Sequence, residues 1–111
     1  MLIDFDAIPE IITHQMRGGE KSVATQTYAD PLCKIIRGRL IPGASVGVHK
    51  HETDSEVIYI LSGQGKVLYD DTCEVLTEGS CHYCPNGHSH GLLNDSNADL
   101  EYLAVIPTHQ T

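Results

Sequence analysis

The chain has 111 residues, of which 41% are hydrophobic, and this is enough to build one domain, residues 1–111, around one core. Seven lysines and arginines against fifteen aspartates and glutamates give a formal net charge of -8. Because this charge repels polyanions, nucleic acid and anionic membrane surfaces are not expected partners, and no apolar run approaches the ~20 residues of a membrane span.

The N-terminus does not have the pattern of an export signal. Asp4 and Asp6 stand among its first residues, and no basic flank precedes an apolar segment. Four cysteines in a chain without such a signal favour reduced thiols over a disulfide framework. We therefore expect a cytoplasmic protein.

The first expected element is a short helical turn over residues 7–12, with Pro9 in its first turn. Beyond it, turn signals recur at short intervals and separate segments that are rich in β-forming residues. These segments are CKIIRGRL (33–40), EVIYILS (56–62), KVLY (66–69), CEVL (73–76), HGLL (90–93) and LEYLAVI (100–106). This spacing is typical of an antiparallel barrel or sandwich, so the chain is predicted to be all-β with six or more strands.

Three histidines and a glutamate stand at positions that suit a metal site. His49 and His51 point the same way if they lie on a strand, because successive side chains alternate faces. Glu56 opens the next strand after a polar stretch, 52–55, that can form a turn and return the carboxylate to the two imidazoles. His90 begins a later apolar strand.

Three imidazoles and one carboxylate suit one divalent transition metal ion, Fe, Mn, Ni, Co or Zn, and suit Mg or Ca poorly. Such a set leaves two positions of an octahedron open for water, substrate or dioxygen.

Residues 43–94 resemble the two motifs of the cupin family. The first motif, G-x5-H-x-H-x4-E-x6-G, is matched by Gly43, His49, His51, Glu56 and Gly63. The second, G-x5-P-x-G-x2-H-x3-N, is matched by Gly79, Pro85, Gly87, His90 and Asn94. The resemblance implies a double-stranded β-helix, or jelly-roll barrel, with His49, His51, Glu56 and His90 as the metal ligands. Ser80 departs from the family, many members of which have Asp after the glycine.

Cys81 and Cys84 form a CxxC motif that encloses His82. There is no second CxxC, and on a predicted strand a separation of three residues puts the two sulfurs on opposite faces. We interpret both cysteines as small apolar residues, with a redox or metal role as the alternative.

Two further positions leave alternatives open. His88 shares a strand face with His90 and is either an additional polar group of the pocket or a residue of its rim. Arg37 and Arg39 lie on one face of a strand. If that face points inward, Arg39 would bind a carboxylate or phosphate of the substrate, but we favour the solvated, outward orientation.

The resemblance implies an enzyme that acts on a small oxygenated or carboxylate substrate through its metal. Cupins include dioxygenases, oxalate-degrading enzymes, sugar-phosphate isomerases and lyases, so the fold does not choose among reactions. The alternative is a non-catalytic module that binds a sugar or another small molecule. The complete ligand set favours the enzyme, as does the lack of room for a helix-turn-helix before Leu32.

A homodimer is also expected. Small cupins pair through an N-terminal strand, and residues 13–28 precede the motifs without another assigned role. Such pairing would cover an exposed sheet edge.

Overall fold

The computed structural model describes residues 1–109, which form ten strands and two short 3-10 turns. The elements are η1 (Phe5–Ala7), β1 (Ile11–His14), η2 (Met16–Gly18), β2 (Ser22–Ala29), β3 (Cys33–Leu40), β4 (Ser45–Lys50), β5 (Glu56–Ser62), β6 (Gly65–Tyr69), β7 (Thr72–Leu76), β8 (Cys81–Cys84), β9 (Ser89–Leu93) and β10 (Leu100–Pro107). The prediction of an all-β chain with six or more strands is confirmed. Within residues 1–109, no helix is long and apolar enough to cross a membrane.

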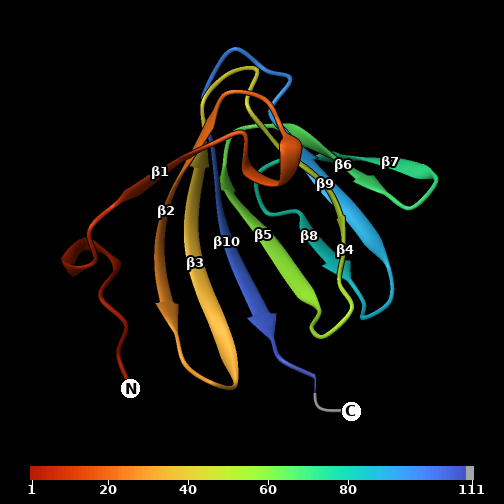
Figure 1. Ribbon diagram of the computed structural model, residues 1–111. Coiled ribbons are helices and arrows are strands. Elements are labelled where there is room, and N and C mark those ends of the chain that lie inside the picture. Colours follow the sequence, from red (N-terminus) through yellow and green to blue (C-terminus); the bar gives the residue numbers. More distant parts are fainter. Residues whose placement is uncertain (110–111) are drawn as a thin grey trace.

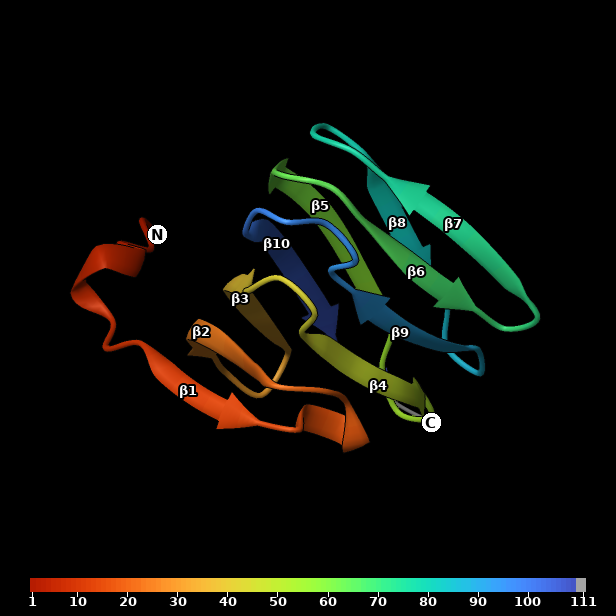
Figure 2. The same cartoon turned by 90° about the horizontal axis from the view of Figure 1, so that it is seen from above.

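The strands form two antiparallel sheets that face each other (Figures 1 and 2). The larger sheet has the order β1-β2-β3-β10-β5-β8, and the smaller has the order β4-β9-β6-β7. Consecutive strands often lie in different sheets, so the chain crosses repeatedly between the layers. This is the arrangement expected of a jelly-roll barrel.

The core lies between the inner faces of the two sheets and consists mainly of branched aliphatic side chains. Leu40, Ile60, Val67 and Leu100 are fully buried in it. On β5, buried residues alternate with half-buried or exposed ones, because successive side chains of a strand point to opposite faces. Glu56 has the same parity as Ile60, so the alternation that builds the core also points the Glu56 carboxylate into the barrel.

The predicted helical turn over residues 7–12 is wrong. The helical residues are Phe5–Ala7, and the Asp4 carboxylate caps this turn by accepting a hydrogen bond from a backbone N–H. From Ile11 the chain is a strand, β1, which pairs with β2. Residues 11–13, soon after Pro9, are all β-branched and favour extended backbone where a neighbouring strand supplies hydrogen-bond partners.

Strand β2 pairs along its length with β3 of the same chain, and β1 lies at the edge of the larger sheet. The side chains of Ile11 and Ile12 on β1 are exposed. The outer edge of β1 therefore has no neighbouring strand among residues 1–109.

Turn η2 lies very close to β4, and two glycines make this approach possible. A Cβ atom added at Gly47 would lie 2.0 Å from the carbonyl oxygen of Arg17, and one added at Gly19 would lie 2.1 Å from the carbonyl oxygen of Ser45. Any larger residue at either position would push η2 away from the sheet. The contact fixes the backbone from which the Met16 and Arg17 side chains extend.

Candidate metal centre and its cavity

His49, His51, Glu56 and His90 lie together between the two sheets, although they come from three separate segments. His49 on β4 pairs directly with His90 on β9 in the smaller sheet. His51 follows β4, and Glu56 begins β5 in the larger sheet. One nitrogen or carboxylate oxygen from each residue lies within 4.8 Å of the others. The structure thus brings together all four residues that the sequence singled out.

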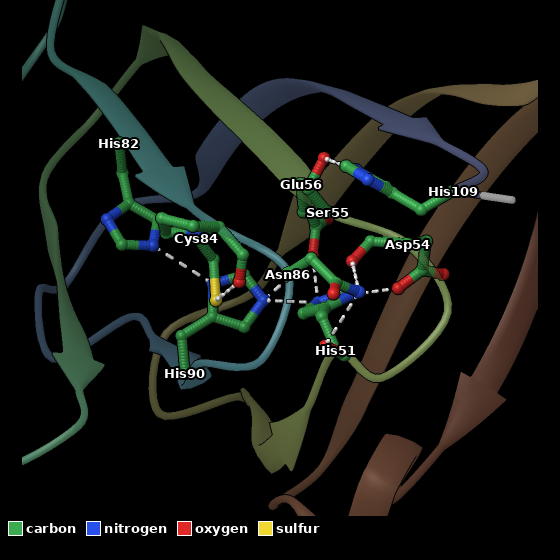
Figure 3. Close-up of polar contacts among 10 residues, drawn as sticks. His51, Asp54, Ser55, Glu56, His82, Cys84, Asn86, His90 and His109 are labelled. Carbon is green, nitrogen blue, oxygen red and sulfur yellow. Dashed lines mark hydrogen bonds and ion pairs between the residues drawn. The ribbon is translucent and has the colours of Figure 1, made fainter. Parts of the chain in front are cut away.

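The Glu56 carboxylate contacts two of the three imidazoles, those of His51 and His90 (Figure 3). Its Oε1 atom is 3.2 Å from Nε2 of His51 and 2.8 Å from Nε2 of His90. The two Nε2 atoms are themselves 2.9 Å apart. Imidazole nitrogens and a carboxylate oxygen converge on one point, and this donor set fits a transition metal ion.

Each of the three imidazoles uses its Nδ1 atom for a contact away from that point. The Nδ1 partners are the Gly47 carbonyl oxygen at 2.7 Å for His49, the Asp54 carboxylate at 2.5 Å for His51, and Nε2 of His82 at 3.0 Å for His90. A carbonyl or carboxylate oxygen only accepts, so for His49 and His51 the proton is on Nδ1 when the ring is neutral. Such outer contacts fix the ring orientation and leave Nε2 as the metal-binding atom.

The charges at the centre are set by burial and by these contacts. Burial raises the pKa of Glu56, but its polar contacts with the His51 and His90 rings outweigh burial and hold this pKa at about 2. The hydrogen bond to Glu56 raises the pKa of His51. Burial lowers the pKa of His49, which favours its neutral form. Glu56 is therefore an anion at neutral pH.

A further buried histidine, His82 on β8, contacts His90 on the side away from His51 (Figure 3). It is only 3% exposed, and its Nδ1 atom is 2.7 Å from the carboxylate of Glu74 on β7. Burial lowers the pKa of His82 and so favours its neutral form. With both rings neutral, Glu74 accepts from His82 Nδ1–H, and His82 Nε2 then accepts from His90 Nδ1–H. Sequence analysis missed this contribution of His82 and Glu74.

A cavity of about 340 Å³ adjoins the four residues. Away from them its walls are largely apolar, and they include Ile36, Ile58 and Leu92. Arg17 and Lys34 also line the cavity and are exposed to solvent, so they lie at its rim. The cavity thus combines the candidate metal centre, an apolar interior and a cationic rim, a combination that suits an anionic ligand. Sequence analysis missed both cations.

Tyr102 on β10 also lines the cavity and is only 5% exposed. Its ring lies over Gly38, its cross-strand partner on β3, where an added Cβ atom would lie 2.2 Å from the ring. Burial raises the pKa of Tyr102, so the hydroxyl keeps its proton. Among the hydrogen bonds formed by residues 1–109, none involves this hydroxyl.

The other residues considered from the sequence lie outside the cavity. His88 is a surface residue whose Nδ1 atom is 2.6 Å from the Asp70 carboxylate, and it does not line the cavity. Cys81 is exposed and Cys84 is buried, as expected for opposite strand faces. Burial raises the pKa of Cys84 to about 11, so it is a neutral thiol.

Arg37 and Arg39 point away from the barrel interior, which agrees with the orientation that we favoured. Arg37 is 2.6 Å from the Asp6 carboxylate, and Arg39 is 3.1 Å from that of Glu10. Both arginines are therefore paired with acids on the outer surface.

Comparison with known proteins agrees with the motifs. An oxalate-binding protein of Thermotoga maritima is 39% identical over 105 residues, which cover 88% of this chain and 85% of the relative. The crystal structure of a predicted oxalate decarboxylase from Thermotoga maritima matches with a TM-score of 0.91 at 32% identity, over 97% of this chain and 99% of that one.

A protein of Thermus thermophilus matches with a TM-score of 0.71 at 25% identity, over 78% of this chain and 85% of that one. The family model of the Cupin domain matches residues 37–106, well over half of the chain. The double-stranded β-helix predicted from the motifs is confirmed, and the chain belongs to the cupin family.

Proposed function

We propose that this protein holds one divalent transition metal ion through His49, His51, Glu56 and His90, and binds a small carboxylate such as oxalate beside that ion. The observation that carries the proposal is the convergence of four donor atoms at the wall of a cavity. The Thermotoga maritima relative described as oxalate-binding supports the same class of ligand.

When bound, the ion supplies positive charge that attracts and polarises a carboxylate oxygen. The residues of the chain prepare the site for it. Asp54 and the Gly47 carbonyl hold two of the imidazoles by their Nδ1 atoms, so that both rings keep their orientation before any ion arrives. The apolar walls limit the access of water to the ligand.

The test begins with protein purified without a His tag. It is stripped with a chelator, reloaded with Mn(II) or Co(II), and titrated with oxalate in a calorimeter. We expect about one ion per chain, and oxalate binding only by the loaded protein. Acetate, which has one carboxylate, serves as the control ligand. Equal binding of oxalate with and without the ion would contradict the proposal.

An enzymatic reaction on the carboxylate is the second candidate, and the complete set of four ligands favours it. The loaded protein is incubated with oxalate with and without dioxygen, and carbon dioxide, formate and dioxygen consumption are measured. Product formed over many turnovers would support an enzyme. Stoichiometric binding without product would support a binding module.

The two cysteines provide a control for the identity of the ligands. We expect the double variant Cys81→Ser/Cys84→Ala to keep its full metal content, because the two thiols lie on opposite strand faces and Cys84 is a neutral thiol. Metal content is measured by atomic emission on folded protein. If the ion is lost with the cysteines, the proposed ligand set is incorrect.

His82 is expected to strengthen metal binding without touching the ion. His82→Phe removes the partner of His90 Nδ1 and should weaken Co(II) binding by about 10–100-fold, the usual cost of losing such an outer contact. Affinity is measured by competition with a chelator. His14→Phe, on the exposed strand β1, is the control. Equal affinity in both variants would show that the contact does not support the ligand.

We also propose that the chain is a single domain that forms a homodimer through β1. The outer edge of β1 and its exposed isoleucines favour pairing with a second copy. Light scattering at micromolar concentration should give about twice the chain mass of 12.1 kDa. A mass equal to that of one chain would contradict the dimer.

A further inference from the structure

We infer that the cavity takes an elongated dicarboxylate, longer than oxalate. One end of this ligand lies at the four-residue centre, an apolar middle section contacts the cavity walls, and the second carboxylate reaches Arg17 and Lys34 at the rim. The inference rests on the proposed metal-dependent binding of a carboxylate and makes its ligand class more specific.

The size of the cavity supports a longer ligand. At about 340 Å³ it falls within the range of pockets that enclose molecules much larger than a two-carbon diacid. Oxalate bound at the centre would leave most of this volume to water. An acid with several carbons between its carboxylates would fill it.

The character of the walls also favours a ligand with an apolar section. Ile36, Ile58, Leu92 and Ile106 line the cavity and come from four different strands, β3, β5, β9 and β10. Oxalate has no methylene group to place against them. Each methylene group that such walls remove from water improves affinity about fourfold.

The rim has two cations whose charge is not used elsewhere among residues 1–109. Neither Arg17 nor Lys34 forms an ion pair with a described residue, whereas Arg37, Arg39 and Lys66 all do. Two carboxylates, Asp54 and Glu56, also line the cavity, but both contact imidazoles of the four-residue centre, so neither neutralises the rim cations. A second carboxylate would neutralise them through charge-assisted hydrogen bonds.

The positions of these two cations are set by the fold. Arg17 belongs to η2, which the glycine contacts hold against β4. Lys34 lies two residues before Ile36 on β3 and therefore shares its inward face. Both side chains thus extend toward the same cavity, Arg17 from a turn beside β4 of the smaller sheet and Lys34 from β3 of the larger sheet.

Tyr102 adds a donor inside the cavity. Its side chain is 95% buried, and its hydroxyl has no hydrogen-bond partner among residues 1–109. No buried side-chain oxygen among the described residues lacks a partner, so the unpaired Tyr102 hydroxyl is open to the cavity, where it can donate to a ligand oxygen. Tyr102 is not one of the four central residues. A ligand confined to the metal centre would therefore leave this donor unused.

The experiment compares two acids that differ only in the second carboxylate. Co(II)-loaded protein is titrated calorimetrically with 2-hydroxyglutarate and with 2-hydroxypentanoate, and the visible absorption of Co(II) reports whether each acid reaches the ion. We expect 2-hydroxyglutarate to bind at least about tenfold more tightly. The double variant Arg17→Gln/Lys34→Gln should lose this preference. Lys50→Gln, which removes an exposed charge outside the cavity, should keep it.

The other outcomes separate this inference from the proposed function. Equal affinity for the two acids would overturn it, since the rim would not recognise the second carboxylate. Binding of oxalate without binding of either longer acid would also overturn it but leave the proposed function intact. Failure of all three anions to bind the loaded protein would overturn both. Even if the double variant does not fold, the comparison of the two acids in the unmodified protein tests whether the second carboxylate is recognised.

Discussion

Replacing His51 with alanine is expected to reduce the metal content of the purified protein from about one ion per chain to a small fraction. His51 contributes an Nε2 atom beside the Glu56 carboxylate, and its Nδ1 contact with Asp54 fixes the ring in that orientation. The loss of a direct ligand should weaken binding by more than the 10–100-fold typical of an outer contact. Atomic emission and competition with a chelator measure the effect.

Two further variants make this result specific. Glu56→Gln preserves the shape of the side chain but removes the only negative charge among the four donors, so metal affinity should again fall. His14→Ala changes an exposed histidine on β1 and should leave the metal content unchanged. Full metal content in His51→Ala would refute the proposed ligand set.

Asn94→Leu is expected to lower the free energy of unfolding by about 3 kcal/mol without removing any metal ligand. Asn94 is fully buried, and its side-chain NH2 group donates to the carbonyl oxygens of Leu40 at 2.9 Å and Ala98 at 2.8 Å. Its Oδ1 atom accepts from the backbone N–H and the hydroxyl of Ser96, at 3.0 and 2.8 Å. Leucine would leave these partners unsatisfied.

The measurement is a urea titration followed by circular dichroism, with metal content determined on the folded fraction. Asn97→Leu is the control, because Asn97 is exposed and lies in the same loop. A normal metal content together with the lower stability would show that the last residue of the second motif acts on the fold. Equal stability of the two variants would show that the buried amide contributes little.

The strands and the four central residues were predictable because local signals specify them. The bounds of β3 and β5 coincide with the predicted segments 33–40 and 56–62, since turn residues flank both. Motif spacing identified the four residues that converge. The failure at residues 7–12 has a different cause, because there pairing with β2 favours a strand where Pro9 suggested a helical start.

The surroundings of the centre were not predictable from such signals. On β8, His82 points to the same face as the buried Cys84. Only the packing of the two sheets against each other shows that this face lies against His90. Arg17 reaches the cavity because η2 packs on β4 at Gly47, a contact between segments far apart in the chain. Contacts of this kind depend on the completed fold.

The division of the four donors between the two sheets also limits how a ligand enters. His49 and His90 belong to the smaller sheet and Glu56 to the larger, so an ion held by all three would tie the two layers together. Motions that separate the two sheets would have to break a bond between the ion and one of its ligands. In the loaded protein the entry route is therefore the rim, where a ligand passes Arg17 on η2 and Lys34 on β3.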